Sequence, residues 1–178
     1  MQPVRLKGFA ALLTFACLAL ALPETTLAEK TKFPSDDPAF SIELPRGWTS
    51  EVDKAGNLDC HAPDDPAYSF GILDMRGIKS TKELKAALLK VAEGTGLKKM
   101  KVGEVEETGS ETMKFLEVKA HGESDGLQLV VVVTGFEAQK GRFFALLGVG
   151  LEEMDKKHAK DYESIAASIE PLMAKSAK

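Results

Sequence analysis

Residues 125–136 read DGLQLVVVVTGF, and this stretch decides the fold that we expect for the chain. Asp125 and Gly126 both tolerate a positive φ, so the pair predicts a tight hairpin turn that leads into a strand. Residues 129–133 are continuously apolar, which indicates a central strand covered on both faces of its sheet. The apolar run is far too short to cross a membrane.

Further strands are predicted on both sides of this central strand. Short turns such as Lys140-Gly141 divide the second half of the chain into four predicted strands, at residues 100–105, 112–120, 127–136 and 142–149. Three earlier strands are predicted at residues 40–44, 58–62 and 68–75. The short turns favour antiparallel pairing of consecutive strands.

Two helices are predicted to cover the sheet. The first spans residues 80–92, where Ser80 and Glu83 have the spacing of a capping box. Its apolar stripe consists of Leu84, Ala87, Leu88 and Val91. The second helix spans residues 156–169, with a buried stripe of Tyr162, Ile165, Ala166 and Ile169. The predicted fold class is therefore α+β, an antiparallel β-sheet flanked by helices on its faces.

Residues 1–28 have the layout of a secretory signal peptide. Arg5 and Lys7 precede an apolar stretch at residues 8–22, and cleavage is predicted after Ala28, with a site after Ala21 as the alternative. We expect residues 29–39 to be a loose lead-in, residues 40–172 to form a single domain, and residues 173–178 to fray. The protein is thus expected to be exported, preferably to the periplasm, with an extracellular or lumenal destination left open.

The composition narrows the possible functions. The chain has 178 residues, of which 44% are hydrophobic and 28% charged, as in an ordinary globular domain. Its formal charge is −4, and it becomes −5 if the leader takes away two basic residues and one acidic residue. This acidity argues against a nucleic-acid binder and favours a basic partner. Only Cys60 would remain after cleavage, so the mature domain must be held by packing without an internal disulfide.

Residues 40–48, FSIELPRGW, resemble the opening strand and Pro-x-Gly-Trp turn of the PsbP/DcrB-like family. Residues 162–169, which include Ser168, resemble the closing helix of that family. The resemblance implies an α/β/α sandwich of about this size. The family includes extrinsic photosystem subunits, bacterial envelope proteins and a Ran-binding protein, and most members act by binding other proteins. The matching motifs are structural, so the resemblance implies no catalytic residue.

No motif in the sequence indicates a catalytic, cofactor or metal site. Cys60 and His61 are neighbours on a predicted strand, so their side chains point to opposite faces, and Cys60 is expected in the core. His121 and His158 lack ligand spacing. Gly148-Val149-Gly150 has the place of a dinucleotide loop, but the carboxylates at residues 152–153 would repel a pyrophosphate.

A short repeat and a tryptophan have structural interpretations. The sequence DDPA occurs at residues 36–39 and again at residues 64–67. Paired carboxylates could bind Ca²⁺, but each copy is better explained as a turn that leads into a strand. Trp48 follows a Pro-Arg-Gly turn and is predicted to fold back against the edge of the core.

Together these observations predict an exported, non-enzymatic envelope protein that acts as a protein-binding accessory or assembly factor. A small-ligand or lipid carrier is the alternative, and a hydrolase without a recognisable motif is third. No nucleic-acid partner, and no stable membrane insertion after signal cleavage, is expected, while the oligomeric state is left open. Loops are expected to carry recognition, and the candidate partner-binding residues are Asp64, Asp65, His121, Asp125 and Lys140.

Overall fold

The computed structural model describes residues 27–63, 65–109 and 113–173. Within these residues the main sheet has eight antiparallel strands, ordered β3-β4-β5-β10-β9-β8-β6, with β7 also paired to β8. The strands span Thr49–Val52 (β3), Leu58–Ala62 (β4), Asp65–Asp74 (β5), Lys98–Val102 (β6), Glu106–Gly109 (β7), Lys114–Ser124 (β8), Leu127–Gln139 (β9) and Arg142–Leu151 (β10).

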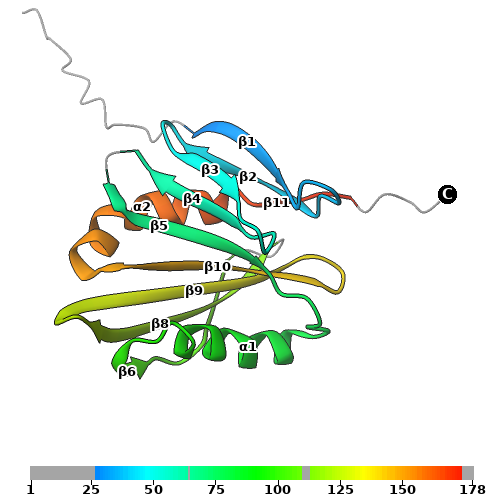
Figure 1. Ribbon diagram of the computed structural model, residues 1–178. Coiled ribbons are helices and arrows are strands. Elements are labelled where there is room, and N and C mark those ends of the chain that lie inside the picture. The colour runs from blue at the N-terminus through cyan, green and yellow to red at the C-terminus, as the bar shows by residue number, and fades with distance from the viewer. Residues whose placement is uncertain (1–26, 64, 110–112, 174–178) are drawn as a thin grey trace, which may run out of the picture.

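A smaller sheet and two helices cover the main sheet. The small sheet has the order β1-β2-β11 and consists of Leu27–Phe33 (β1), Phe40–Pro45 (β2) and Glu170–Pro171 (β11). The helices are Thr81–Glu93 (α1) and Glu152–Ala167 (α2). Figure 1 shows α1 on one side of the main sheet, and the small sheet with α2 on the other. The predicted α+β class, an antiparallel sheet with helices on its faces, is confirmed.

The apolar stretch forms the central strand, as predicted. β9 lies between β8 and β10, and residues 130–136 are all buried. Alternation along β9 sends Val131 and Val133 toward α1 and Phe136 toward the small sheet. The two faces of one strand therefore belong to two separate hydrophobic clusters.

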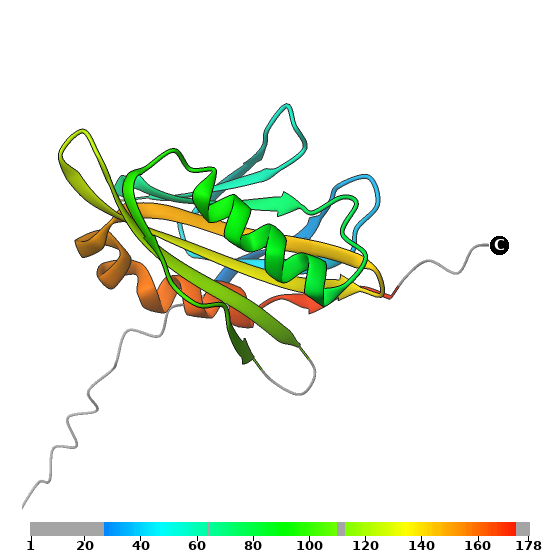
Figure 2. The ribbon, with the colours of Figure 1, turned by 90° about the horizontal axis from the view of Figure 1, so that it is seen from below.

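Helix α1 begins at the predicted cap and packs by the predicted stripe. The Ser80 hydroxyl accepts a hydrogen bond from the Glu83 N–H at 3.2 Å, and the Glu83 carboxylate accepts one from the Lys79 N–H at 2.8 Å. Leu84 and Leu88 are buried against β8, β9 and β10, and Figure 2 shows the helix lying across these strands. A Cβ at Gly135 would lie 2.9 Å from both Leu88 methyl carbons, so this close approach requires glycine.

Phenylalanines fill the space between the main and small sheets. Phe40 of β2 lies with its ring centroid 5.2 Å from that of Phe136 and 4.9 Å from that of Phe144, both in edge-on arrangements. Phe33 of β1 packs edge-on against Phe40 and Phe144 as well. Ile165 and Ile169 join the same cluster, which confirms the second buried stripe at these two positions.

The predicted loose lead-in at residues 29–39 is wrong for its first part. Residues 27–33 form β1, which pairs antiparallel with β2. Phe33 is 1% exposed and anchors the strand in the core. Lys30 and Lys32 face solvent, so the hydrophobicity of this segment alone does not indicate a strand. Strand 40–44 is confirmed, but it belongs to the small sheet rather than to the main one.

Other boundaries also differ from the prediction. The predicted strand at residues 100–105 corresponds to β6, which begins at Lys98 and ends at Val102, and a separate short strand, β7, follows at Glu106; the two pair with different parts of β8. β3 was not predicted, and its residues are all exposed. α2 begins at Glu152 instead of residue 156. The acidic residues of its first turn, Glu152, Glu153 and Asp155, suit the positive end of the helix dipole.

Leu88→Ala should lower the free energy of unfolding by about 2–5 kcal/mol, because Leu88 is fully buried between α1 and the sheet. Leu127→Ala is the matched control, since Leu127 is 55% exposed and should change stability by less than about 0.5 kcal/mol. Urea unfolding of the three proteins measures both values. Equal, small effects at the two positions would contradict the packing of α1.

Cys60 should react slowly in the folded protein. It is fully buried on β4, as predicted. Burial, and to a smaller extent the nearby Asp59 charge, raises the pKa of its thiol to about 12. Because the thiolate is the reactive form, a disulfide reagent near pH 8 should react about 1000-fold faster in denaturant than in buffer. Equal rates in the two solutions would show that the thiol is accessible.

Candidate functional site

Strand β8 is covered on one face only. On the α1 side, Leu116, Val118 and Ala120 are all buried. On the opposite side the alternate positions change from the buried Phe115 to the partly exposed Glu117, and then to Lys119 and His121, which are exposed. The small sheet and α2 therefore leave this side of β8 open, although it borders the central strand.

A groove of about 910 Å³ lies at the Phe115 end of this open strip. We call it the α2 groove; α2, β8, β7 and residues 169–171 line it. Its apolar surface includes Met113, Phe115 and Ile169. Three glutamates also line it, Glu117 from β8, Glu163 from α2 and Glu170 from β11. The groove thus combines apolar contact area with several carboxylates.

A chain of hydrogen bonds holds one of these carboxylates. The Tyr162 hydroxyl of α2 donates to Thr134 Oγ1 of β9 at 2.9 Å, and Thr134 donates to Glu117 Oε2 at 3.2 Å. The direction is fixed because an ionised carboxylate only accepts, so the single Thr134 proton goes to Glu117 and the tyrosine must donate. Burial is the main cause that raises the pKa of Tyr162, so the phenol keeps its proton.

The charge around Glu117 is only partly compensated. Glu106 of β7 lies directly opposite Glu117 in the antiparallel register, which places two like charges on the same face. Lys119 Nζ lies 3.8 Å from Glu117 Oε1, at the long end of an ion pair. Glu170 is bonded to Lys30 of β1 at 2.5 Å. Glu163 forms no ion pair within the part of the chain that the structure describes.

The other end of the open strip is basic. Lys101 of β6 lies opposite His121 of β8, and the two residues line a hollow of about 400 Å³ together with Lys99 and Gln128. Lys99 is paired with Glu123 at 2.9 Å. The strip therefore changes from acidic to basic along β8.

An aromatic cluster surrounds His158 of α2. His158 is 8% exposed and stacks on Tyr68 of β5, with ring centroids 4.4 Å apart. Its Nδ1 lies 3.0 Å from Asp161 Oδ2. Trp48 contacts both rings edge-on, which confirms that it folds back onto the core. These contacts fix α2 against β5, and they explain why His158 is buried despite its charged sequence surroundings.

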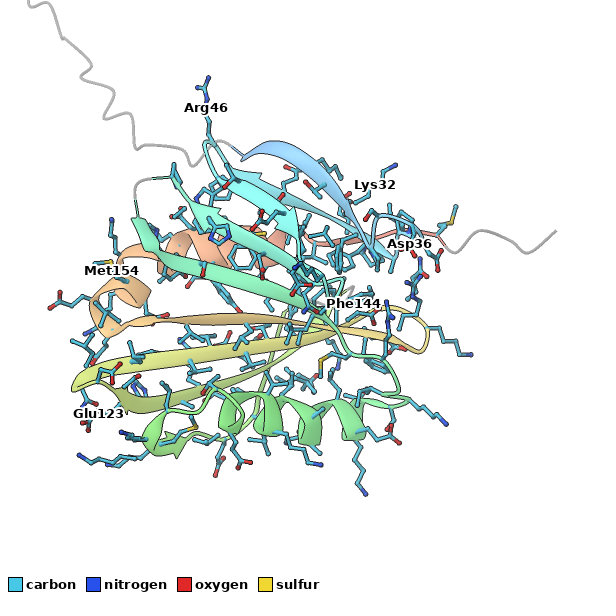
Figure 3. The ribbon with its side chains drawn as sticks, viewed as in Figure 1. Lys32, Asp36, Arg46, Glu123, Phe144 and Met154 are labelled. Atoms are coloured by element: carbon cyan, nitrogen blue, oxygen red, sulfur yellow. The ribbon has the colours of Figure 1, made fainter. Side chains whose placement is uncertain are left out.

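The predicted partner-binding residues do not form one surface. Asp125, with φ 51°, lies in the β8–β9 turn, and Lys140 lies in the β9–β10 turn at the other end of the 13-residue strand β9, roughly 40 Å away. Figure 3 shows the corresponding ends of the molecule, with Glu123 at one and Asp36 at the other. His121 is exposed on the basic part of the strip.

Asp65 belongs to β5 and not to the turns that hold Asp125 and Lys140. The backbone of Asp65 pairs with Ala62 at the start of β5, and Asp64 lies outside the described residues. In the first copy of the repeat, Arg142 donates to the Asp37 carboxylate at 3.0 Å and to the Asp37 carbonyl at 3.1 Å. This copy therefore supports the structural interpretation, a turn that leads into β2. Among the described residues, no group of three or more His, Cys, Asp or Glu side chains is placed to hold a metal ion.

The sequence reasoning missed the α2 groove. Glu117, Thr134 and Tyr162 come from three elements, and no short motif connects them. One signal was present: residues 117, 119 and 121 are polar at alternate positions in a strand next to the central one. That pattern indicates a sheet face that the second layer leaves open.

No protein-family model and no curated protein matches the sequence. Solved structures do match the fold. The cyanobacterial PsbP of Synechocystis sp. PCC 6803 has a TM-score of 0.61 and 10% identity, covering 85% of this chain and 96% of that one. LpqN of Mycobacterium tuberculosis, described as involved in cell envelope biogenesis, has a TM-score of 0.55 and 15% identity, covering 82% and 91%.

A protein from Bacteroides thetaiotaomicron has a TM-score of 0.60 and 17% identity, and the match covers 83% of this chain but 50% of that one. These structures show that the chain has the PsbP/DcrB-like fold, as the resemblance in residues 40–48 implied. Among the described residues, no helix is both long enough and apolar enough to span a membrane.

Proposed function

We propose that the protein is exported and acts as a protein-binding accessory or assembly factor of the cell envelope, without turning over a substrate. The observation that carries this proposal is the α2 groove. It offers apolar side chains and carboxylates on a rigid sheet-and-helix frame, and this combination suits non-covalent recognition. The fold of LpqN, a protein described as involved in cell envelope biogenesis, supports a role in that compartment.

A small-ligand or lipid carrier is the second candidate, because the groove's volume of about 910 Å³ could hold a drug-sized molecule. The glutamates favour the first candidate. An anionic lipid would be repelled by Glu117 and Glu163, and a neutral hydrocarbon would take water from the Glu117 carboxylate without offering it a hydrogen bond.

Export is proposed from the basic, apolar and small-residue order of residues 1–28. The mature protein should begin at Glu29, inside β1, and keep the part of that strand that contains Phe33. Intact-mass measurement of the protein recovered from the producing cell's envelope fraction checks this. A product that retains residues 1–20 would contradict export by this signal.

The binding role predicts that the α2 groove contacts a protein in the envelope. A photo-crosslinking residue at position 167 should give one or a few discrete protein adducts in intact cells, because Ala167 is exposed and lines the groove. Ala86 is the matched control, an exposed alanine on α1 across the main sheet. Gel analysis and mass spectrometry of the adducts give the result.

Three results would count against this role. Equal labelling from positions 167 and 86 would show that the groove has no special contact. A co-purified small molecule of a few hundred daltons in native mass spectrometry, displaced by a Phe115→Ala change, would favour the carrier. Turnover of a screened substrate that a groove variant abolishes without unfolding would overturn the non-enzymatic role.

A further inference from the structure

The α2 groove is specialised by one carboxylate that is held in place. Glu117 receives the end of the hydrogen-bond chain from Tyr162 through Thr134, so its orientation is fixed by residues of α2 and β9. A carboxylate has about four acceptor positions. Thr134 occupies one, and the Lys119 contact at 3.8 Å is long, so Glu117 can still accept strong hydrogen bonds from a ligand.

Lys119, at 3.8 Å, is the one cation that pairs with Glu117 among the described residues, and negative charges outnumber it. Glu106 lies opposite it in the β7–β8 register, and Glu163 lies across the groove without an ion pair among the described residues. Like charges directly opposite each other in a sheet are destabilising. A bound cation would relieve that repulsion, so the charge complementarity of the groove favours a positively charged occupant.

The apolar lining determines what kind of cation fits. Met113, Phe115 and Ile169 pack in the core and present their remaining exposed surface to the groove beside the glutamates, and a small hydrated ion would gain nothing from this apolar surface. An occupant gains most if apolar groups flank its charge, since buried apolar area contributes about 25 cal/mol per Å². A lysine or arginine within an apolar stretch of polypeptide meets both requirements, with its stem on the apolar side chains and its charge at Glu117.

We propose that the α2 groove binds a segment of a partner protein in which one lysine or arginine lies between apolar side chains, with Glu117 as the oriented acceptor and Glu163 as the second charge. This inference rests on the proposed protein-binding function. It adds which side chains the partner segment carries and which residues of the groove, Glu117 and Glu163, bind them.

The test uses mixtures of blocked peptides of about nine residues, with a fixed central residue and randomised flanks. The central residue is Arg, Lys, Gln or Glu in four otherwise identical mixtures, and each mixture is panned against the immobilised mature protein. Arg- or Lys-centred peptides should be retained at least tenfold more than Gln-centred ones, with Leu, Ile, Met or Phe enriched beside the centre. Retention should fall as salt rises from about 0.02 M to about 0.5 M.

Variants locate the binding to the groove. Glu117→Gln keeps the size of the side chain and its acceptor for Thr134, and it should weaken the selected peptides at least tenfold. Glu163→Lys should weaken them by a similar factor, whereas Glu93→Lys, an exposed change on α1, should leave affinity within about twofold. Tyr162→Phe should weaken them less, because it removes only the group that orients Thr134. Fluorescence anisotropy with selected peptides gives the affinities, and urea unfolding checks that each variant is folded.

The outcomes separate this inference from the proposed function. If Gln- or Glu-centred peptides bind best, or if Glu93→Lys is as harmful as Glu163→Lys, the inference is wrong even where crosslinking at position 167 finds a partner. If no mixture is retained above the level of bovine albumin as bait, the inference is also wrong. The protein-binding function is tested separately: it fails if position 167 gives no adducts beyond those of position 86.

Discussion

The burial of β9 on both faces is the constraint on which the rest of the structure depends. A strand with apolar residues at successive positions is stable only when two layers cover it, one on each side. α1 provides the first layer with Leu84 and Leu88. The second layer is composite, made of the small sheet and α2, and it centres on Phe40 and Ile165. Because this second layer covers β9, β10 and β5 better than β8, a groove remains along the edge of α2.

Much of the fold could be predicted because its signals are local. The apolar run, the Asp125-Gly126 turn and the cap at Ser80 each act within a few residues of their own position. β1 could not be predicted in this way, since its lysines face solvent and its pairing with β2 supplies the stabilisation. The α2 groove could not be predicted for a similar reason. Thr134 lies 17 residues from Glu117 and 28 from Tyr162, so only the tertiary fold brings them together.

Different features of this protein bear on its fold and on its function. The matches to PsbP and LpqN, at 10% and 15% identity, establish an architecture and leave its surfaces unassigned. The surface of β8 is more informative, because its two faces have different chemistry. One face supplies Leu116 and Val118 to the core, and the other presents Glu117 near α2 and His121 near β6.

The small sheet joins the two ends of the described chain. β1 and β11 both pair with β2, and the Leu172 N–H donates to the Ala39 carbonyl at 2.9 Å. The layer over Phe40 therefore cannot close until residues 170–172 have been synthesised and released. A chain that emerges from the ribosome N-terminus first stays incomplete throughout its elongation. Completion of the core is therefore delayed until the C-terminal strand β11 reaches β2.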